Sequence, residues 1–251
     1  WRIKYFYDKN AFYRDEDDKV PPKWEMKASS RLHISSVINS VTHVVKKSEV
    51  LDLPPLLKET RLVALPPSLR KSYSEMDEQL KTIVNDKTFN AVNALSKIVK
   101  LMQLVNGDFI QGEKHEHVAS PKLEVLAELV EQVISANSKC VIWSCFLRPI
   151  HDICSMLDAM EIKHVKIIGG MDQPEREAAI VEFQNGDTPI IVCSQGAAGE
   201  GIELTAANYM IYYCRNFNLG HDLQSEGRAY RAGSERHKHI VRYDIICEDT
   251  I

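Results

Sequence analysis

The chain has 251 residues, of which 44% are hydrophobic and 26% are charged, and its formal net charge is −4 at pH 7. This composition is ordinary for a globular protein and excludes a wholly disordered chain, because it supplies enough apolar surface for a core. A protein that attracts nucleic acid through a general positive field is usually basic. Any nucleic-acid contact must therefore depend on a few basic side chains, backbone N–H groups and helix N-termini. No apolar run approaches the roughly 18 residues that a membrane-spanning helix needs, so no membrane partner is expected.

Six cysteines are scattered along the chain, and none belongs to a Cys-x-x-Cys pair. Several lie in apolar runs, which favours buried free thiols in a reducing compartment over a disulfide framework, and no metal ligands are predicted. The sequence has no signal peptide and both ends are abrupt, so it is interpreted as a fragment of a longer protein. The cysteines are Cys140, Cys145, Cys154, Cys193, Cys214 and Cys247.

Residues 1–118 are expected to be mainly helical. Ser29 or Ser30 could cap the first amphipathic helix, and the prolines of LDLPP end it. Asn106-Gly107 stops the last of these helices, and the polar residues up to Ser120 are expected to form a connector. The expected elements are a helix over 34–45, a short strand over 61–67, and helices over 69–83 and 92–105.

Residues 119–251 change rhythm, because short apolar strands now alternate with helices. Such alternation predicts an α/β fold with a doubly wound, mainly parallel sheet. Sheets of this kind bind ligands at the carboxyl ends of their strands, which points to the loops that follow them. The expected strands cover 140–146, 164–170, 188–194, 208–214 and 239–247, with helices over 120–133, 150–157, 174–186 and 222–233 between them.

Two arginines stand three residues apart in QSEGRAYRAG. On the expected helix this spacing puts Arg228 and Arg231 on one face. Guanidinium groups make planar, bidentate contacts to phosphate oxygens, and an arginine beside a γ-phosphate stabilises the charge that develops during phosphoryl transfer. The spacing alone, however, favours a pair of surface arginines bound to Glu226 and Glu235.

A loop of small residues follows the strand IIVCS. Such a loop lets a ligand approach the backbone closely, and Ser194 and Gln195 offer donors for a phosphate. A tight structural turn explains the loop equally well.

Two further strand ends could hold a phosphate. Ser144 ends a strand just before a helix, where N–H groups and the helix dipole can bind an anion, although a helix cap is the favoured interpretation of this serine alone. Gly170 turns the chain after another strand, and Arg176 opens the helix that follows, where it could instead pair with glutamates.

Along the chain, these segments run from the strand with Ser144, through the turn at Gly170 and the loop after IIVCS, to QSEGRAYRAG and a final strand, and in this order they resemble motifs IV, V and VI of superfamily 2 helicases. LDLPP at 51–55, KLMQLVNGDF, SPKLEVL at 120–126, KCVIWSCF and the closing YDIICEDTI resemble the Swi/Snf branch of DNA translocases. This resemblance covers nearly the whole chain. It implies a RecA-like C-terminal lobe over 119–251, preceded by a helical inter-lobe protrusion and linker over 1–118.

The resemblance also implies roles for particular residues. Arg228 and Arg231 match the arginines that reach across to ATP bound on the other lobe. Four residues match positions that bind ATP or line its cleft, namely Gly199, Gly201, Glu203 and Gln224. Five residues are assigned to the nucleic-acid backbone, namely Ser144, Gly170, Arg176, Ser194 and Gln195.

The sequence lacks a GxxxxGK[ST] loop and a DExH-type carboxylate pair, the elements that cradle phosphates and hold magnesium. ATP and Mg²⁺ are therefore expected to be held mainly by an N-terminal RecA-like lobe of the parent chain, and the fragment alone is expected to be inactive. Its other expected partner is nucleic acid, with double-stranded DNA favoured.

The chain departs from the family at Tyr230, where His is frequent, at 232–234, and at 214–218, where Asp and Trp-Asn-Pro are usual. These departures suggest a divergent member from a bacterium or phage, located in the cytoplasm, or in the nucleus if the source is eukaryotic. A non-catalytic nucleic-acid-binding or scaffold module of the same fold is the alternative, against which the intact GRxxR argues. An unrelated α/β enzyme is disfavoured, because no complete catalytic constellation occurs.

Overall fold

The computed structural model of the chain describes residues 2–11, 22–43, 45, 47–85, 91–111, 114–117, 120–197 and 201–251. Contacts between residues divide the chain into two compact units, residues 1–51 and 52–251. No helix in the described ranges is both long enough and apolar enough to cross a membrane.

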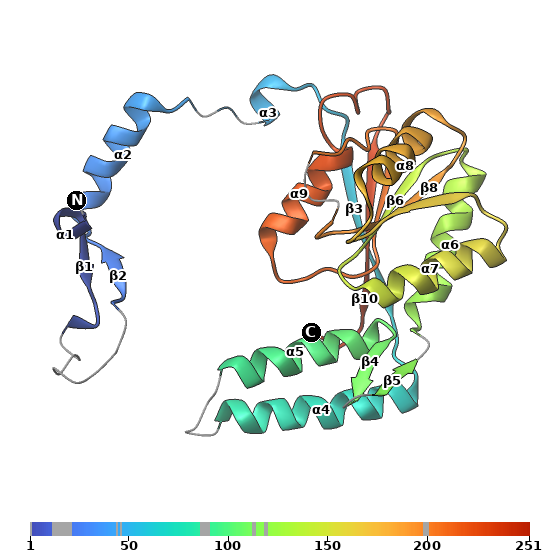
Figure 1. Cartoon of the computed structure of the whole chain (residues 1–251), viewed down its shortest axis with the longest axis horizontal. Coiled ribbons are helices and arrows are strands. Elements are labelled where there is room, and N and C mark those ends of the chain that lie inside the picture. The colour runs from blue at the N-terminus through green and yellow to red at the C-terminus, as the bar shows by residue number, and fades with distance from the viewer. Residues whose placement is uncertain are drawn as a thin grey trace. The chain divides into compact units, whose positions relative to one another are not determined.

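The second unit is built on a six-stranded sheet in the order β3-β10-β9-β6-β8-β7, in which every neighbouring pair is parallel (Figure 1). All five residues of β6 are buried, as are the first four of β8, which is typical of parallel strands covered on both faces. The predicted parallel, doubly wound sheet is thus confirmed. The strands are β3 (Leu56–Val63), β6 (Cys140–Ser144), β7 (His164–Ile167), β8 (Ile190–Ser194), β9 (Tyr209–Tyr212) and β10 (Ile240–Cys247).

Helices cover both faces of this sheet (Figure 1). Successive residues of a strand point to opposite faces. Ile142 therefore packs in the cluster that contains residues of α6 and α7, whereas Val141 and Trp143 pack in the cluster that contains Phe183 of α8 and Ala229 of α9. The helices are α6 (Lys122–Ser135), α7 (Leu147–Ala159), α8 (Gln173–Asn185) and α9 (Leu219–Ala229).

The sheet also includes a strand from the region that the sequence assigned to the helical protrusion. β3 pairs with β10 in parallel along its whole length, from Leu56 opposite Ile240 to Val63 opposite Cys247. The strand expected over 61–67 therefore begins earlier and ends earlier. The first compact unit ends at residue 51, so β3 belongs to the second unit together with the other strands of the sheet.

Two long helices, α4 (Pro67–Asn85) and α5 (Ala91–Val105), lie side by side below the sheet (Figure 1). Leu69 and Tyr73 of α4 and Leu101 and Leu104 of α5 join the same buried cluster as the inner face of the sheet. After α5, the expected polar connector is wrong, because β4 (Asp108–Gln111) and β5 (Lys114–His117) form an antiparallel pair. Ladder bonds are made by the backbone, so a polar sequence can form them.

The first unit contains short elements. β1 (Phe6–Asp8) pairs antiparallel with β2 (Trp24–Met26). The expected helix exists as α2 (Ser30–Val41), but it ends before Val45, and Ser29 precedes it without a side-chain capping bond. The remaining helices of this unit are α1 (Arg2–Tyr5) and α3 (Lys47–Val50).

Candidate functional site

A cavity of about 490 Å³ opens at the carboxyl edge of the sheet, beyond the ends of β7 and β8. We call it the Gln195 pocket. Three segments form it: the turn after β7 and the start of α8, the loop after β8, and the helix α9. The pocket therefore brings together residues from three of the four sequence segments that suggested phosphate binding, and leaves out the segment of Ser144. Its lining residues include Gly170, Arg176, Gln195, Gly196, His221 and Gln224.

The side chain of Gln195 is the most unusual group in this pocket. The residue is only 1% exposed, and its backbone N–H donates to the carbonyl of Ser144 at 3.0 Å, which fixes the loop to the end of β6. Neither amide atom of the side chain has a hydrogen-bond partner among the described residues. A buried polar group without a partner costs about 1–3 kcal/mol, so such a group marks a place where a ligand can complete its bonds.

Gly170 and Arg176 shape the opposite wall. Gly170 has φ +85°, a backbone conformation that favours glycine. The helix α8 then begins with Asp172 as its cap, whose Oδ1 accepts from the N–H of Glu175 at 2.9 Å. Arg176, in the first turn of α8, donates from Nη2 to the carbonyl of Ala197, so its guanidinium joins α8 to the loop after β8.

The third wall is the helix α9. Asn218 caps it, because its Oδ1 accepts from the N–H groups of Gly220 at 2.9 Å and His221 at 3.4 Å. Gln224 is exposed and faces the pocket, and Arg228 follows one turn later on the same helix, half-buried. The predicted ATP-side residue Gln224 and the predicted backbone contacts Gln195 and Arg176 thus share one cavity.

Arg231 does not lie on α9, so the prediction that both arginines share a helix face is wrong. The helix ends at Ala229, and the carbonyl of Arg231 accepts from both the N–H and the hydroxyl of Ser234, at 3.0 and 2.7 Å. Gly233 has φ +100° in this turn. The chain therefore turns after Ala229, whereas the sequence indicated helix as far as Gly233.

The guanidinium of Arg231 is half-buried and makes no hydrogen bond or ion pair with any described residue. The two glutamates that were expected to pair with Arg231 bind other groups. Glu226 binds Lys58 at 2.7 Å and Arg242 at 2.6 Å, and Glu235 accepts from the N–H of Gly233 at 2.6 Å. The interpretation of Arg231 as half of a surface salt bridge to these glutamates is therefore not supported.

The segment GIELTAA lies against the end of α9. The N–H of Leu204 donates to the carbonyl of Arg228 at 2.9 Å, and Glu203 is exposed, accepting from the hydroxyl of Thr205 at 2.8 Å. Gly201 is exposed with φ +70°, and Gly199 lies outside the described residues. Neither Gly201 nor Glu203 lines the Gln195 pocket.

The two predicted serines lie outside the pocket. Ser144 and Ser194 end neighbouring strands directly opposite each other. Ser144 has no exposed surface; its hydroxyl donates to the carbonyl of Phe146 at 2.8 Å and lies 3.2 Å from the sulfur of Cys214. Its hydroxyl is thus bonded within the fold, and the residue does not cap α7, because Phe146 occupies that position.

Sequence reasoning missed a charged cluster centred on Arg242. This residue is 3% exposed and binds Asp222 and Glu226 of α9 at 3.1 and 2.6 Å and Asp244 of its own strand at 3.2 Å. Its guanidinium carbon lies 4.0 Å from the ring centroid of Tyr212. The cluster fixes α9, and with it Gln224 and Arg228, on the sheet. Two charged residues at alternate positions of an apolar strand were the available signal.

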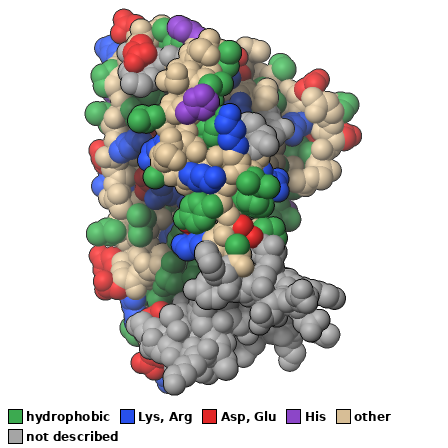
Figure 2. Space-filling view, turned by 90° about the vertical axis from the view of Figure 1, so that its left-hand side faces the viewer, with side chains coloured by type: hydrophobic (Ala, Val, Ile, Leu, Met, Phe, Trp, Pro, Cys, Tyr) green, Lys and Arg blue, Asp and Glu red, His purple; other side chains and the backbone are tan. Residues whose placement is uncertain are grey.

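The surface carries no broad field of one sign in the described part of the chain that Figure 2 draws. Lys and Arg side chains on that face are interspersed with hydrophobic and acidic ones. This agrees with the formal net charge of −4.

Comparison with known proteins finds a family model and several relatives that are similar to this chain. The family described as the helicase conserved C-terminal domain matches residues 121–233. A putative ATP-dependent helicase/translocase of Bacillus subtilis, YwqA, is 28% identical over 197 residues, which are 76% of this chain and 21% of that protein. The yeast (Saccharomyces cerevisiae) ATP-dependent helicase FUN30 is 29% identical over 164 residues, 64% of this chain and 13% of that protein. The chain thus spans about a fifth or less of the length of these relatives.

Solved structures agree with the fold. The SWI2/SNF2 ATPase core of Sulfolobus solfataricus, in complex with double-stranded DNA, has a TM-score of 0.64 at 23% identity, over 87% of this chain and 47% of that chain. The C-terminal part of the Fun30 ATPase domain has a TM-score of 0.62 at 18% identity, over 79% and 87%. The chain therefore shares the fold of these ATPase structures, and the helicase C-terminal domain model matches it over residues 121–233.

Proposed function

We propose that the chain serves as the C-terminal motor lobe of an ATP-dependent DNA translocase. The observation that carries this proposal is the Gln195 pocket, in which residues of the turn after β7, the loop after β8 and α9 meet at the carboxyl edge of the sheet. ATP-driven closure of two lobes would shift nucleic-acid contacts made at this edge. The double-stranded DNA bound in the similar SWI2/SNF2 ATPase core structure supports DNA as the substrate.

The arginines would act on ATP bound by the other lobe. The guanidinium of Arg231 has no partner among the described residues, which leaves its donors available for phosphate oxygens. Such an arginine stabilises charge on a transferring phosphoryl group. Arg228 and Gln224, held on α9, would line the same cleft together with Gly199, Gly201 and Glu203. Mg²⁺ would be held mainly by the N-terminal lobe, because the sequence lacks the GxxxxGK[ST] loop and the DExH-type carboxylates that hold it.

The Gln195 pocket would hold the nucleic-acid backbone. The amide of Gln195 offers unused donors, Arg176 supplies a positive charge, and the turn at Gly170 exposes backbone. Ser194 could add its backbone at the end of β8. Contacts of this kind carry no base readout, so binding would be sensitive to salt and largely independent of sequence.

The test is ATP hydrolysis by the intact parent protein, with and without double-stranded DNA, in wild type and Arg231→Ala. The matched control is Arg148→Ala, which removes an exposed arginine of α7 paired with Asp152 at 3.2 Å. We expect DNA to stimulate wild type and the control equally, and Arg231→Ala to lose about 10³-fold or more in turnover while it still binds ATP. Absence of hydrolysis in wild type, or equal turnover of Arg231→Ala, would favour a non-catalytic scaffold.

A further inference from the structure

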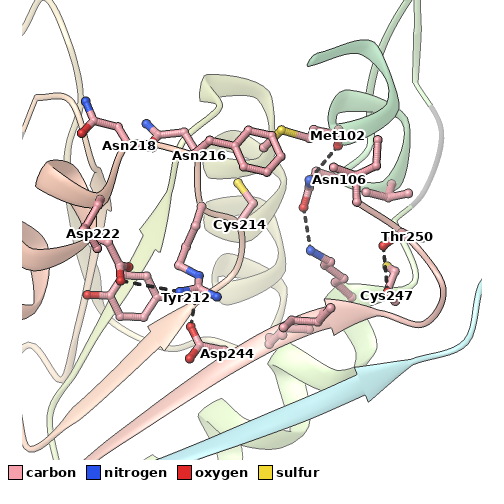
Figure 3. Close-up of a pocket in the computed structure, with 18 residues that line it drawn as sticks. Met102, Asn106, Tyr212, Cys214, Asn216, Asn218, Asp222, Asp244, Cys247 and Thr250 are labelled. Carbon is pink, nitrogen blue, oxygen red and sulfur yellow. Dashed lines mark hydrogen bonds and ion pairs between the residues drawn. The ribbon is translucent and has the colours of Figure 1, made fainter. Parts of the chain in front are cut away.

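A second cavity, of about 390 Å³, lies on the other side of the start of α9, at the carboxyl ends of β9 and β10 (Figure 3). Cys214, the residue after Tyr213, lines this cavity and is 4% exposed. The other lining residues used below are Asn106, Lys122 and Tyr212.

Cys214 lies against a second thiol, that of Cys145. The strands β6 and β9 are paired in parallel with Trp143 opposite Tyr212, and the N–H of Tyr213 donates to the carbonyl of Trp143 at 3.0 Å. Continuing this register puts Cys145 opposite Cys214. The two sulfur atoms are 3.3 Å apart. Neighbouring strands lie about 4.8 Å apart, within the range of Cα separations that a disulfide bridges, so a bond needs a sulfur movement of only about 1 Å.

The surroundings of Cys214 favour its thiolate. Its sulfur accepts from the N–H of Cys145 at 3.2 Å and lies 3.2 Å from the hydroxyl of Ser144. The ammonium of Lys122, on the same cavity, is bound to the side-chain oxygen of Asn106 and the carbonyl of Tyr213, each at 3.0 Å. Both of these partners are neutral. Burial lowers the pKa of Lys122, and the sulfur groups that oppose this lowering when they are ionised are Cys214, Cys247 and Cys145.

These contacts shift the pKa values of the Cys214 and Cys145 thiols in opposite directions. Burial raises the pKa of Cys214, but the hydrogen bond from Cys145, the charge of Lys122 and the bond from Ser144 together bring this pKa below its ordinary value. The pKa of Cys145 is raised, because its S–H donates to Cys214. Burial raises the pKa of all four remaining cysteines, so Cys214 is the single acidic thiol of the six.

We propose that Cys214 and Cys145 form a peroxide-oxidisable thiol pair, in which Cys214 is the reacting sulfur and Cys145 the resolving one. The Cys214 thiolate attacks one oxygen of hydrogen peroxide, the O–O bond breaks, and Cys214 sulfenic acid and hydroxide form. The Cys145 thiol then attacks the sulfenic sulfur, its proton goes to the departing hydroxyl, and water leaves. In total, two thiols are oxidised to one disulfide and one peroxide is reduced to two waters.

The position of the two thiols determines how peroxide reaches them and what a disulfide between them would change. Peroxide is small enough to enter a cavity of about 390 Å³, and Cys145 is only half-buried. The disulfide would join the end of β6 to the loop that runs from Cys214 to the cap of α9, Asn218. It would also remove the negative charge that faces Lys122.

The experiment treats the fully reduced 251-residue chain with a few equivalents of hydrogen peroxide and maps its peptides under non-reducing conditions by mass spectrometry. We expect one product, the Cys145–Cys214 cross-link. Cys145→Ser should accumulate a sulfenic acid at Cys214, captured by dimedone, and Cys214→Ser should leave Cys145 reduced at the same dose. Cys154→Ser, which removes an unrelated thiol of α7, should behave as wild type. Oxidation of Cys145 in Cys214→Ser, or of Cys154 before Cys214, would overturn the proposal.

A second measurement needs no variant. The rate of cross-linking in wild type is followed between pH 9 and pH 7. An ordinary buried thiol loses about tenfold in reactive thiolate per pH unit over this range, whereas a stabilised thiolate loses less than about twofold in all. A tenfold fall in rate per unit would contradict Cys214 as the reacting sulfur.

Discussion

Nη1 of Arg242, on the strand β10, lies 2.6 Å from Oε2 of Glu226, on the helix α9. Arg242 also binds Asp222 one turn earlier on the same helix, at 3.1 Å. The helix that presents Gln224 and Arg228 is thereby bound to the sheet by charged hydrogen bonds as well as by apolar packing. Because the guanidinium is almost fully buried, removal of it would leave several carboxylates without their main partner.

Arg242→Met should therefore destabilise the chain by about 3–5 kcal/mol, the usual result of breaking a buried ion pair from one side. Urea denaturation measures the free energy of unfolding. Arg61→Met is the matched control, because Arg61 of β3 pairs with Glu59 at 3.3 Å on a partly exposed surface, where such pairs are worth about 1 kcal/mol or less. A loss at Arg242 no larger than at Arg61 would mean that α9 is held by packing alone.

Gly170→Ala tests the turn that forms one wall of the Gln195 pocket. A Cβ at this position meets nothing within 4 Å, so the change is limited by the backbone and not by space. At φ +85° an alanine should cost about 1–2 kcal/mol of stability. Gly169→Ala, next to it and equally open but without a positive φ, should cost less than about 1 kcal/mol. Equal losses in the two variants, measured by thermal denaturation, would exclude backbone strain as the cause.

Much of the second unit could be predicted from sequence, because its strands are apolar runs bounded by polar turns and its helices repeat at 3.6 residues. CVIWS and IIVCS were recognised in this way, and both are buried strands. The partner of β3 could not be predicted, since its pairing with β10 joins residues about 180 positions apart. The β4–β5 pair was also missed, because its four-residue strands carry no apolar alternation.

The segments of the candidate site could be named from the sequence, but their arrangement in space could not be predicted. The segments with Gly170, Arg176, Gln195 and Gln224 were named from sequence, and one cavity joins them. Their meeting depends on strand order, which no local pattern encodes. The end of α9 before Arg231 could not be predicted from the sequence, because Ala-Tyr-Arg-Ala contains no helix breaker.

The stability of the chain should depend on pH through Glu226. Burial raises the pKa of this carboxyl, but hydrogen bonds and charge from Lys58 and Arg242 bring it below its ordinary value. A carboxylate with a lowered pKa in the folded state contributes its full stability above the unfolded pKa, about 4.3 for Glu, and loses it as pH falls through the folded value. The difference in unfolding free energy between wild type and Glu226→Gln should therefore be full at pH 7 and pH 5 and shrink below about pH 4.

Urea titrations of both proteins at these pH values measure that difference. Glu59→Gln is the control, since its carboxylate pairs on the surface and should contribute little at any pH. If the difference in unfolding free energy between wild type and Glu226→Gln stays constant or grows in acid, the charge of Glu226 does not stabilise the fold.

Gln195→Met separates stability from binding, because it keeps the length of the side chain and removes the amide. The amide atoms have no partner among the described residues, so their removal should leave the free energy of unfolding unchanged or raise it by about 1–3 kcal/mol. If the amide donates to a backbone phosphate, the same change should weaken double-stranded DNA binding by the intact parent protein about tenfold or more at constant salt. Gln132→Met, on the exposed face of α6, should change neither quantity. Loss of stability in Gln195→Met would indicate that the amide has a structural role, and unchanged DNA affinity would remove Gln195 from the proposed interface.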